Sequence, residues 1–248
     1  MTHAAAVGRS LRVYHDPARR PALDAFYGRF LKPGDIAFDV GAHVGDRALC
    51  FARLGARVVA VEPQPRLARA LRLILKGRDA ALVQALVGEA PGQATLHLNT
   101  ANPTVATASA EFIAAAAGAP GWEGQSWDAS LTLPVTTLDL LIAAHGEPAF
   151  LKIDIEGYEA VALAGLSCPV PALSFEFTTI QRDVAVVALR RCVALGYRHF
   201  NASLGESLEM AHPAAIGAAA LEAWLLALPP EANSGDIYAA LDNASLNR

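Results

Sequence analysis

A lysine and two acidic residues occupy alternate positions near the middle of the chain: Lys152, Asp154 and Glu156. They end an apolar run, starting at residue 149, that has the composition of a buried strand. Alternate residues of an extended chain share a face, so both carboxyl groups can reach one cleft. A carboxylate can orient a hydroxyl group or accept its proton, and a nearby lysine keeps acids ionised. We therefore interpret Asp154 as a base or orienting group, Glu156 as its partner and Lys152 as their counter-charge.

These residues also have plain structural explanations. Acids just ahead of a helix are favoured there by the helix dipole, and Lys152 could form only a structural ion pair. Their place at the carboxyl end of a predicted strand favours a site over a cap. Glu176 ends the next apolar run and could line the same cleft.

A glycine turn follows an earlier apolar run, over residues 36–46. Its pattern is D-x-G-x-x-x-G, formed by Asp39, Gly41 and Gly45. Glycine has no Cβ, so the backbone can approach a ligand closely or take a positive φ. Dinucleotide pyrophosphates need the tighter G-x-G-x-x-G spacing. The looser form suits a ligand without phosphate, such as S-adenosylmethionine.

A third acid, Glu62, ends the apolar run over residues 57–61, about twenty residues after the glycine turn. A carboxylate at this place can accept hydrogen bonds from both ribose hydroxyls of an adenosine group. Pro63 disfavours helical backbone at Glu62 and so keeps it at the strand tip. The alternative is a solvated acid at a strand end.

Strand-like and helix-like patterns alternate along the chain, as expected for an α/β domain with a mostly parallel sheet. A helical segment within 1–34 precedes a single domain over 35–248, with neither repeat nor linker. Strands are expected at 36–40, 57–63, 81–87, 94–98, 149–157, 171–177, 197–200 and 207–210, the last two as a hairpin. Helices are expected at 21–31, 44–54, 65–75, from Thr136 or Thr137 to 142, and at 158–164, 184–195 and 216–228.

Residues 99–133 interrupt this alternation. They are rich in Ala, Thr, Ser, Asn and Gly and contain Trp122 and Trp127. A segment this long between sheet elements is typically a lid or binding loop, and the aromatic residues argue against full disorder. We interpret it as an insert that covers the substrate.

Composition excludes several classes of protein. Hydrophobic residues make up 53% of the 248, and mean hydropathy is +0.30, so the chain is not disordered. The net charge of −4 argues against general electrostatic binding of nucleic acid. Apolar runs are too short for a membrane span, no signal peptide is evident, and the three cysteines show no disulfide or zinc spacing. A cytoplasmic protein is expected.

Four stretches resemble the FkbM family of S-adenosylmethionine-dependent methyltransferases. They are FDVGAHVG (38–45), VAVEP (59–63), TLD (137–139) and LKIDIEGYE (151–159), of which the last is the most distinctive. The similarity extends over roughly residues 35–200 and implies a class I methyltransferase fold, with a seven-stranded sheet whose last strand is antiparallel. His43 stands where the family more usually has Asn, and we expect its ring to be neutral or turned away.

The resemblance implies O-methylation of a hydroxyl on a sugar or secondary metabolite, with S-adenosylmethionine held by Asp39, Gly41, His43, Gly45 and Glu62. The acid that often binds adenine after the third strand is missing, so Gln84, or backbone over 85–87, is the expected contact. The acceptor is a small molecule, and a homo-oligomer is possible because the C-terminal helix is apolar.

Three other functions are weighed. A non-catalytic scaffold that binds S-adenosylmethionine is less favoured, because Asp154 and Glu156 lie beside the expected methyl group. A nicotinamide oxidoreductase does not fit the glycine spacing and lacks a nearby Tyr-x-x-x-Lys pair. Asp154 and Glu156 could ligate Mg²⁺, but the sequence suggests no third ligand, so no metal is expected.

Overall fold

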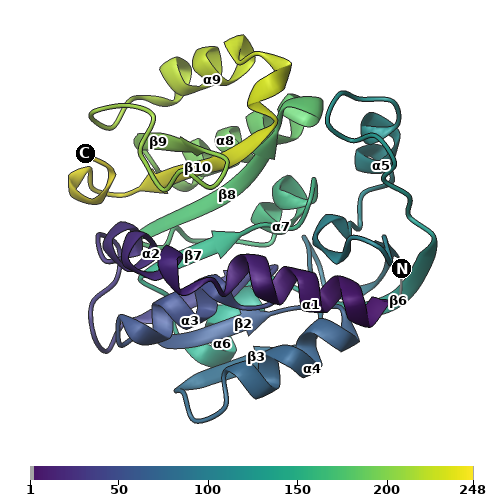
Figure 1. Ribbon diagram of the computed structural model, residues 1–248. Helices are drawn as coiled ribbons and strands as arrows, with labels where there is room; N and C mark the ends of the chain where they lie inside the picture. Colours follow the sequence, from purple (N-terminus) through teal and green to yellow (C-terminus); the bar gives the residue numbers. More distant parts are fainter. Residues whose placement is uncertain (1–2, 248) are drawn as a thin grey trace.

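The computed structural model describes residues 3–247, which include a seven-stranded sheet with helices on both faces (Figure 1). The strand order is β3-β2-β1-β7-β8-β10-β9. Neighbours from β3 to β8 are parallel, whereas β10 is antiparallel to both β8 and β9. The α/β class and the mostly parallel seven-stranded sheet predicted from sequence are therefore confirmed. The strands are β1 (Ile36–Val40), β2 (Arg57–Val61), β3 (Ala80–Val83), β7 (Phe150–Ile153), β8 (Ala172–Thr178), β9 (His199–Leu204) and β10 (Ser234–Ala240).

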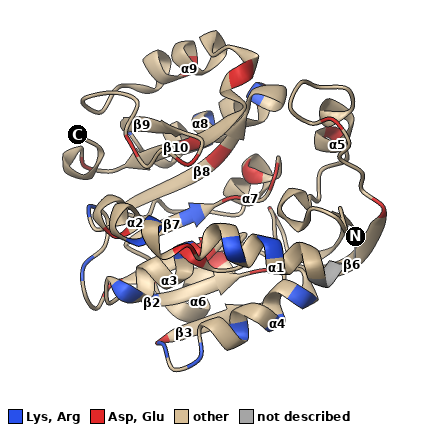
Figure 2. Ribbon diagram, viewed as in Figure 1, with Lys and Arg blue, Asp and Glu red and all other residues tan. Residues whose placement is uncertain are grey.

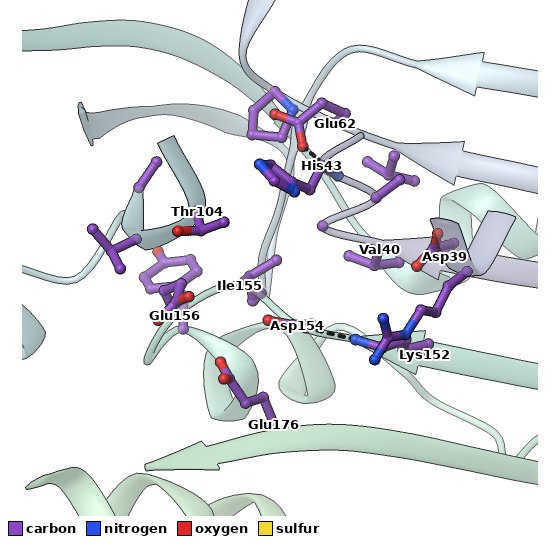
Figure 3. Close-up of a pocket in the computed structure, with 18 of the residues that line it drawn as sticks. Asp39, Val40, His43, Glu62, Thr104, Lys152, Asp154, Ile155, Glu156 and Glu176 are labelled. Carbon is purple, nitrogen blue, oxygen red and sulfur yellow. Dashed lines mark hydrogen bonds and ion pairs between the residues drawn. The ribbon is translucent and has the colours of Figure 1, made fainter. Parts of the chain in front are cut away.

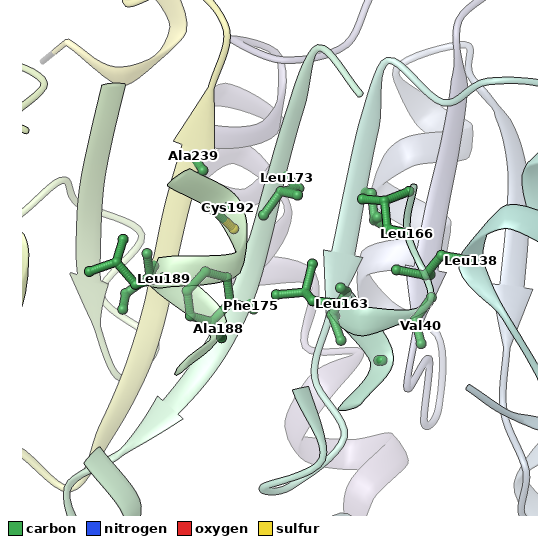
Figure 4. Packing of buried hydrophobic residues seen from close by; sticks show 14 of the residues in the cluster. Val40, Leu138, Leu163, Leu166, Leu173, Phe175, Ala188, Leu189, Cys192 and Ala239 are labelled. Atoms are coloured by element: carbon green, nitrogen blue, oxygen red, sulfur yellow. The ribbon is translucent and has the colours of Figure 1, made fainter. Parts of the chain in front are cut away.

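Successive side chains of each strand point to opposite faces of the sheet, and they pack into two separate apolar clusters. One cluster joins Phe38 and Phe175 of the sheet to α6 (Leu138–His145), α7 (Glu159–Ala164), α8 (Arg182–Leu195) and α9 (Ala218–Ala227). Figure 4 shows part of this layer, with Leu163, Leu189 and Cys192 against Phe175. The other cluster joins Ala37 and Phe150 to α2 (Arg20–Tyr27), α3 (Asp46–Arg53) and α4 (Pro65–Ile74). Burial on both faces explains the near-continuous apolar strands.

A three-stranded sheet carries the insert. Its order is β4 (Leu86–Val87), β6 (Ala129–Thr136) and β5 (Gly92–Leu98). The single strand expected over 81–87 is wrong, because the chain leaves the edge of the large sheet after Val83, and Leu86 pairs instead with Val135. Between β5 and β6 lie η2 (Pro103–Val105) and α5 (Ala110–Ala116). Of the two residues at which this helix was expected to start, Thr136 and Thr137, it is Thr137 that caps α6, by accepting a hydrogen bond from the Leu140 amide at 3.1 Å.

Two elements near the chain ends differ from the predictions. The hairpin expected over 197–210 is wrong: β9 extends to Leu204, residues 207–210 form no strand, and the partner of β9 is β10, beyond α9. Strand β10 escaped notice because all but its first residue are buried, so it shows no alternation. The helix α1 (His3–Tyr14) lies in a stretch that gave no clear pattern.

No helix among residues 3–247 has the length and apolar character needed to cross a membrane.

Candidate active site

A cavity of about 330 Å³ opens at the carboxyl ends of the parallel strands (Figure 3). Glu62 and His43 lie at one end of it and Glu176 at the other, with Lys152 and Asp39 to one side. Among the predicted site residues, those that line it are Asp39, Gly41, His43, Glu62, Lys152, Asp154 and Glu156. The fold therefore brings Asp39 into one cavity with Asp154 and Glu156, which lie more than one hundred residues later in the sequence.

Gly41 allows the ends of β1 and β7 to meet. Its φ is +85°, and a Cβ at this position would lie 1.7 Å from the backbone oxygen of Asp154. The amides of Gly41 and Ala42 donate to the Val61 carbonyl at 2.9 and 3.0 Å, which fixes the turn beside β2. Only glycine fits a position with this φ and this contact. Gly45 does not line the cavity; it precedes α3 with a left-handed φ of +79°.

Glu62 is 3% exposed, and backbone donors hold its carboxylate. The His43 amide donates to Oε2 at 2.9 Å, and the Gln64 amide donates to Oε1 at 2.8 Å. Burial raises the pKa of Glu62 to about 8, although these two hydrogen bonds act in the opposite direction. A rigid carboxyl group with spare lone pairs thus faces the cavity.

His43 lies in the left-handed region, with φ +49°, and its ring meets Tyr14 edge-on at 5.3 Å between centroids. Burial lowers the pKa of His43 to about 4, so the ring is neutral near pH 7. Its Nε2 is buried and has no hydrogen-bond partner among the described residues. A bound ligand could therefore use this nitrogen.

Asp39 also carries an unused oxygen. The residue is 2% exposed, and its Oδ2 has no hydrogen-bond partner within the described part of the chain. Burial raises the pKa of Asp39 to about 6, although the nearby Lys152 opposes that shift. Buried polar atoms are rarely left unpaired, so Asp39 and His43 both point to a polar ligand.

Lys152 and Asp154 form an ion pair, with Nζ 2.6 Å from Oδ2. The lysine side chain is 4% exposed, whereas that of Asp154 is 36% exposed. Burial by itself would raise the pKa of Asp154, but the ammonium outweighs it, and the net pKa lies below the ordinary value. Asp154 is thus held ionised directly after the carboxyl end of β7.

The capping role considered for Asp154 and Glu156 is not observed, because α7 begins after Tyr158 without a side-chain cap. Glu159 accepts hydrogen bonds from the Ile155 amide at 2.9 Å and the Gly157 amide at 3.3 Å. Glu156 has a positive φ of 55°, and its carbonyl accepts from Thr107 Oγ1 at 2.6 Å, so the insert fixes this turn. The carboxyl group of Glu156 faces the cavity, and burial and Asp154 raise its pKa well above the ordinary value.

Two further acids reach the cavity from β8 and β10. Glu176 and Asp236 are register partners in these antiparallel strands, so their side chains share a face. Burial, followed by the charge of Asp154, raises the pKa of Glu176, and burial raises that of Asp236. Figure 2 shows the acidic position on β8 near the basic position on β7 at the centre of the molecule. Sequence analysis suggested Glu176 but missed Asp236, because β10 was not recognised.

Arg47 and Tyr14 were missed as well. Arg47 is 7% exposed and bonds to Asp46 of its own helix and to Glu206 Oε2 at 2.5 Å. These ion pairs join α3 to the loop after β9 at the cavity wall. The sequence does show an arginine directly after the acid that begins α3. It does not show that Glu206, far along the chain, is the partner of that arginine.

The insert forms another wall. Residues 103–106 and Trp122 line the cavity, and Gln64 Nε2 donates to the Pro103 carbonyl at 2.9 Å. Trp122 packs edge-on against Phe112 at 5.1 Å between ring centroids. Gln84 is exposed and does not line the cavity, whereas the buried residues 85–87 do. Of the two expected adenine contacts, Gln84 lies away from the site, and only residues 85–87 line the cavity.

Comparison with solved structures finds methyltransferases with low sequence identity. A TehB-like SAM-dependent methyltransferase from Corynebacterium glutamicum is 10% identical, with a TM-score of 0.49 and coverage of 96% of this chain and 98% of that one. Precorrin-6y C5,15-methyltransferase from Geobacter metallireducens is 14% identical, with a TM-score of 0.43 and coverage of 89% and 87%. Aeropyrum pernix fibrillarin, with natively bound S-adenosyl-L-methionine, is 11% identical, with a TM-score of 0.43 and coverage of 84% and 67%.

No curated protein matches the chain in sequence. The methyltransferase FkbM domain, however, matches residues 39–189, which is more than half of the chain and contains Asp39, Glu62, Asp154 and Glu176. The sheet order, the glycine turn and the acid after β2 agree with this match. The chain therefore belongs to the FkbM family of methyltransferases and has a class I, Rossmann-like methyltransferase fold.

Proposed function

We propose that the protein transfers a methyl group from S-adenosylmethionine to a hydroxyl group of a sugar or secondary metabolite. The observation that carries this proposal is one cavity that joins Glu62, after β2, to the carboxyl groups after β7. The first group suits an adenosyl ligand and the second suits a hydroxyl acceptor.

Residues at the β1–β2 end would hold the cofactor. Glu62 accepts hydrogen bonds from the ribose hydroxyls, the backbone at Gly41 approaches the ligand, and residues 85–87 border the adenine. The unpartnered atoms Asp39 Oδ2 and His43 Nε2 are suited to the polar amino-acid part of the cofactor. When bound, S-adenosylmethionine supplies a methyl group activated by its sulfonium.

Residues at the β7–β8 end would hold the acceptor. Asp154, kept ionised by Lys152, accepts a hydrogen bond from the reacting hydroxyl and orients it. Glu156, whose pKa is raised, is the better proton acceptor once it is ionised. Thr178, Ser234 and Tyr158 also line the cavity and can bond to further hydroxyls. The excess of carboxyl groups disfavours acceptors that carry phosphate or carboxylate near the reacting oxygen.

The insert over 99–133 would cover the acceptor. Its residues line the cavity opposite the sheet, and Thr107 bonds to the carbonyl of Glu156. Deletion of this insert should abolish affinity for the acceptor while largely preserving affinity for the cofactor.

Calorimetry with Glu62→Ala tests the cofactor site. The variant should bind S-adenosylmethionine about 100-fold more weakly, because two hydrogen bonds from the ribose hydroxyls to the Glu62 side chain are lost. Glu89→Ala, at an exposed acid in the turn before β5, is the control and should bind like the natural protein. If the natural protein takes up no S-adenosylmethionine, or Glu62→Ala binds it unchanged, the proposal is wrong.

Labelled cofactor tests the acceptor class. Incubation with pools of sugars and hydroxylated metabolites should give a product heavier by one methylene unit, and Asp154→Asn should slow its formation. Methylation of amines alone would contradict the assignment of a hydroxyl acceptor.

A further inference from the structure

Three carboxyl groups converge at the acceptor end of the cavity. One oxygen of each of Asp154, Glu156 and Glu176 lies within 4.8 Å of the other two. Ca²⁺ binds oxygen at about 2.3–2.6 Å, so oxygens on opposite sides of its shell are about 5 Å apart. The three oxygens therefore have a separation that one divalent cation can bridge.

A fourth carboxyl group, outside this trio, lines the same cavity and has one oxygen without a partner among the described residues. Asp236 is 9% exposed, lines the same cavity and stands opposite Glu176 in the β8–β10 register. Its Oδ1 has no hydrogen-bond partner among the described residues, and its Oδ2 has only a long bond of 3.4 Å from the Tyr238 hydroxyl. Glu176 Oε2 is likewise buried without a partner. Unpaired oxygens of this kind need a donor or a cation.

The described residues supply little positive charge here. Lys152 is paired with Asp154 at 2.6 Å. Arg47, another cation on the cavity wall, is already bonded to Asp46 and Glu206. Of these four carboxyl groups, only Asp154 is bonded to an ammonium group, so ionising the other three in this buried site would need a further cation.

We propose that Asp154, Glu156 and Glu176 bind a hard divalent cation such as Mg²⁺, Mn²⁺ or Ca²⁺, with Asp236 beside it and the acceptor oxygen as a further ligand. Oxygen-only donors select this class of metal. No metal was expected from the sequence, because Asp154 and Glu156 were the two candidate ligands and no third was evident. Glu176 supplies the third from a strand that only the sheet order places beside β7.

The inference rests on the proposed function and gives the cation a role in it. A divalent cation lowers the pKa of a hydroxyl bound to it and fixes the position of that oxygen. Each of the three residues needs only one oxygen for the cation. The second oxygen of Glu156 can then take the proton of the hydroxyl as the new carbon–oxygen bond forms and the carbon–sulfur bond breaks.

The probe is Mn²⁺, and its binding is measured as the loss of the electron paramagnetic resonance signal of the free ion. The full chain is first saturated with S-adenosylhomocysteine, whose binding is measured separately by calorimetry. The natural protein should bind one Mn²⁺, and Mg²⁺ should displace it. Glu176→Gln should weaken Mn²⁺ binding by about tenfold or more, as expected when a ligand is lost, without changing the affinity for S-adenosylhomocysteine.

Glu209→Gln is the control, because this acid is exposed and does not line the cavity. It should bind Mn²⁺ like the natural protein. If Glu176→Gln does not fold, Glu156→Gln takes its place. If the natural protein binds S-adenosylhomocysteine but no Mn²⁺, the metal site is wrong and the proposed function still stands. The same conclusion follows if Glu176→Gln binds Mn²⁺ as tightly as the natural protein. Failure to bind S-adenosylhomocysteine would count against the proposed function itself.

Discussion

The two ends of the cavity hold their carboxyl groups in opposite ways. At the β1–β2 end, a backbone amide bonds to each of the two carboxyl oxygens of Glu62, and Asp39 keeps one buried oxygen without a partner among the described residues. At the β7–β8 end, four acids from three strands gather around one lysine, and two of their buried oxygens have no partner among the described residues. The first end is thus set by local backbone geometry. The second depends on side chains and on whatever binds there.

The largest effect should come from the residue that joins the two ends. Gly41→Ala places a Cβ against the Asp154 carbonyl at a φ of +85°, so it should lower the free energy of unfolding by about 3 kcal/mol or more. It should also abolish uptake of S-adenosylmethionine. Urea denaturation and calorimetry measure the two effects.

Gly77→Ala is the matched control for that change. Gly77 has a φ of +78°, but no atom lies within 4 Å of the added Cβ, so only backbone strain of about 1 kcal/mol is expected. Equal losses in both variants would show that the contact between the β1 and β7 loops is unimportant.

The insert should respond separately from the cofactor end. Phe112 is fully buried in a small cluster with Trp122, so Phe112→Ala should cost this region about 3 kcal/mol. Hydrogen exchange should accelerate over residues 103–127 while the amides of β1 and β2 stay protected. Phe112→Leu should have a milder effect. Exchange that rises equally in β1 and β2 would mean that the insert is not a separable layer.

Removing the lysine tests the acceptor end directly. Lys152→Met leaves Asp154 without its counter-charge, and the free energy of unfolding should fall by about 2 kcal/mol, less than for a fully buried pair because Asp154 is partly exposed. Turnover should fall while cofactor affinity is kept. Lys76→Met, at an exposed lysine, should change stability by less than about 0.5 kcal/mol.

The smallest effect concerns His43 and depends on pH. Its pKa falls from 6.5 to about 4 on folding, so the unfolded chain binds the proton more tightly, and stability is lost as pH falls through this window. Asp46 and Asp154 face the ring and favour its charge, whereas His15 and burial oppose it. His43→Asn removes the titration. Relative to the natural protein, the variant should therefore gain about 1–2 kcal/mol between pH 7.5 and pH 5.

Urea denaturation of both proteins at the two pH values gives this difference. A constant difference in stability would show that His43 titrates normally.

Local sequence patterns were enough for most of the fold. Apolar runs predicted β1, β2, β7 and β8, and the start of α6 was narrowed to Thr136 or Thr137. They also placed Asp39, Glu62 and Asp154 at strand ends, because parallel strands present their carboxyl ends at one edge. Bounds differed by a few residues, as for α3, which begins at Asp46 and not at Val44.

The sequence by itself thus determined the α/β pattern, the glycine turn and the acid after β2, since each is encoded within a few neighbouring residues. Only the tertiary structure decided that β10 lies between β8 and β9, which brings Asp236 to Glu176. It also decided that Glu159 bonds to the amides of the turn before α7, that Glu156 faces the cavity, and that Gln84 does not line it. The physical reason is that local periodicity reports which face a residue takes. Which side chains then meet depends on strand order and on contacts between distant segments.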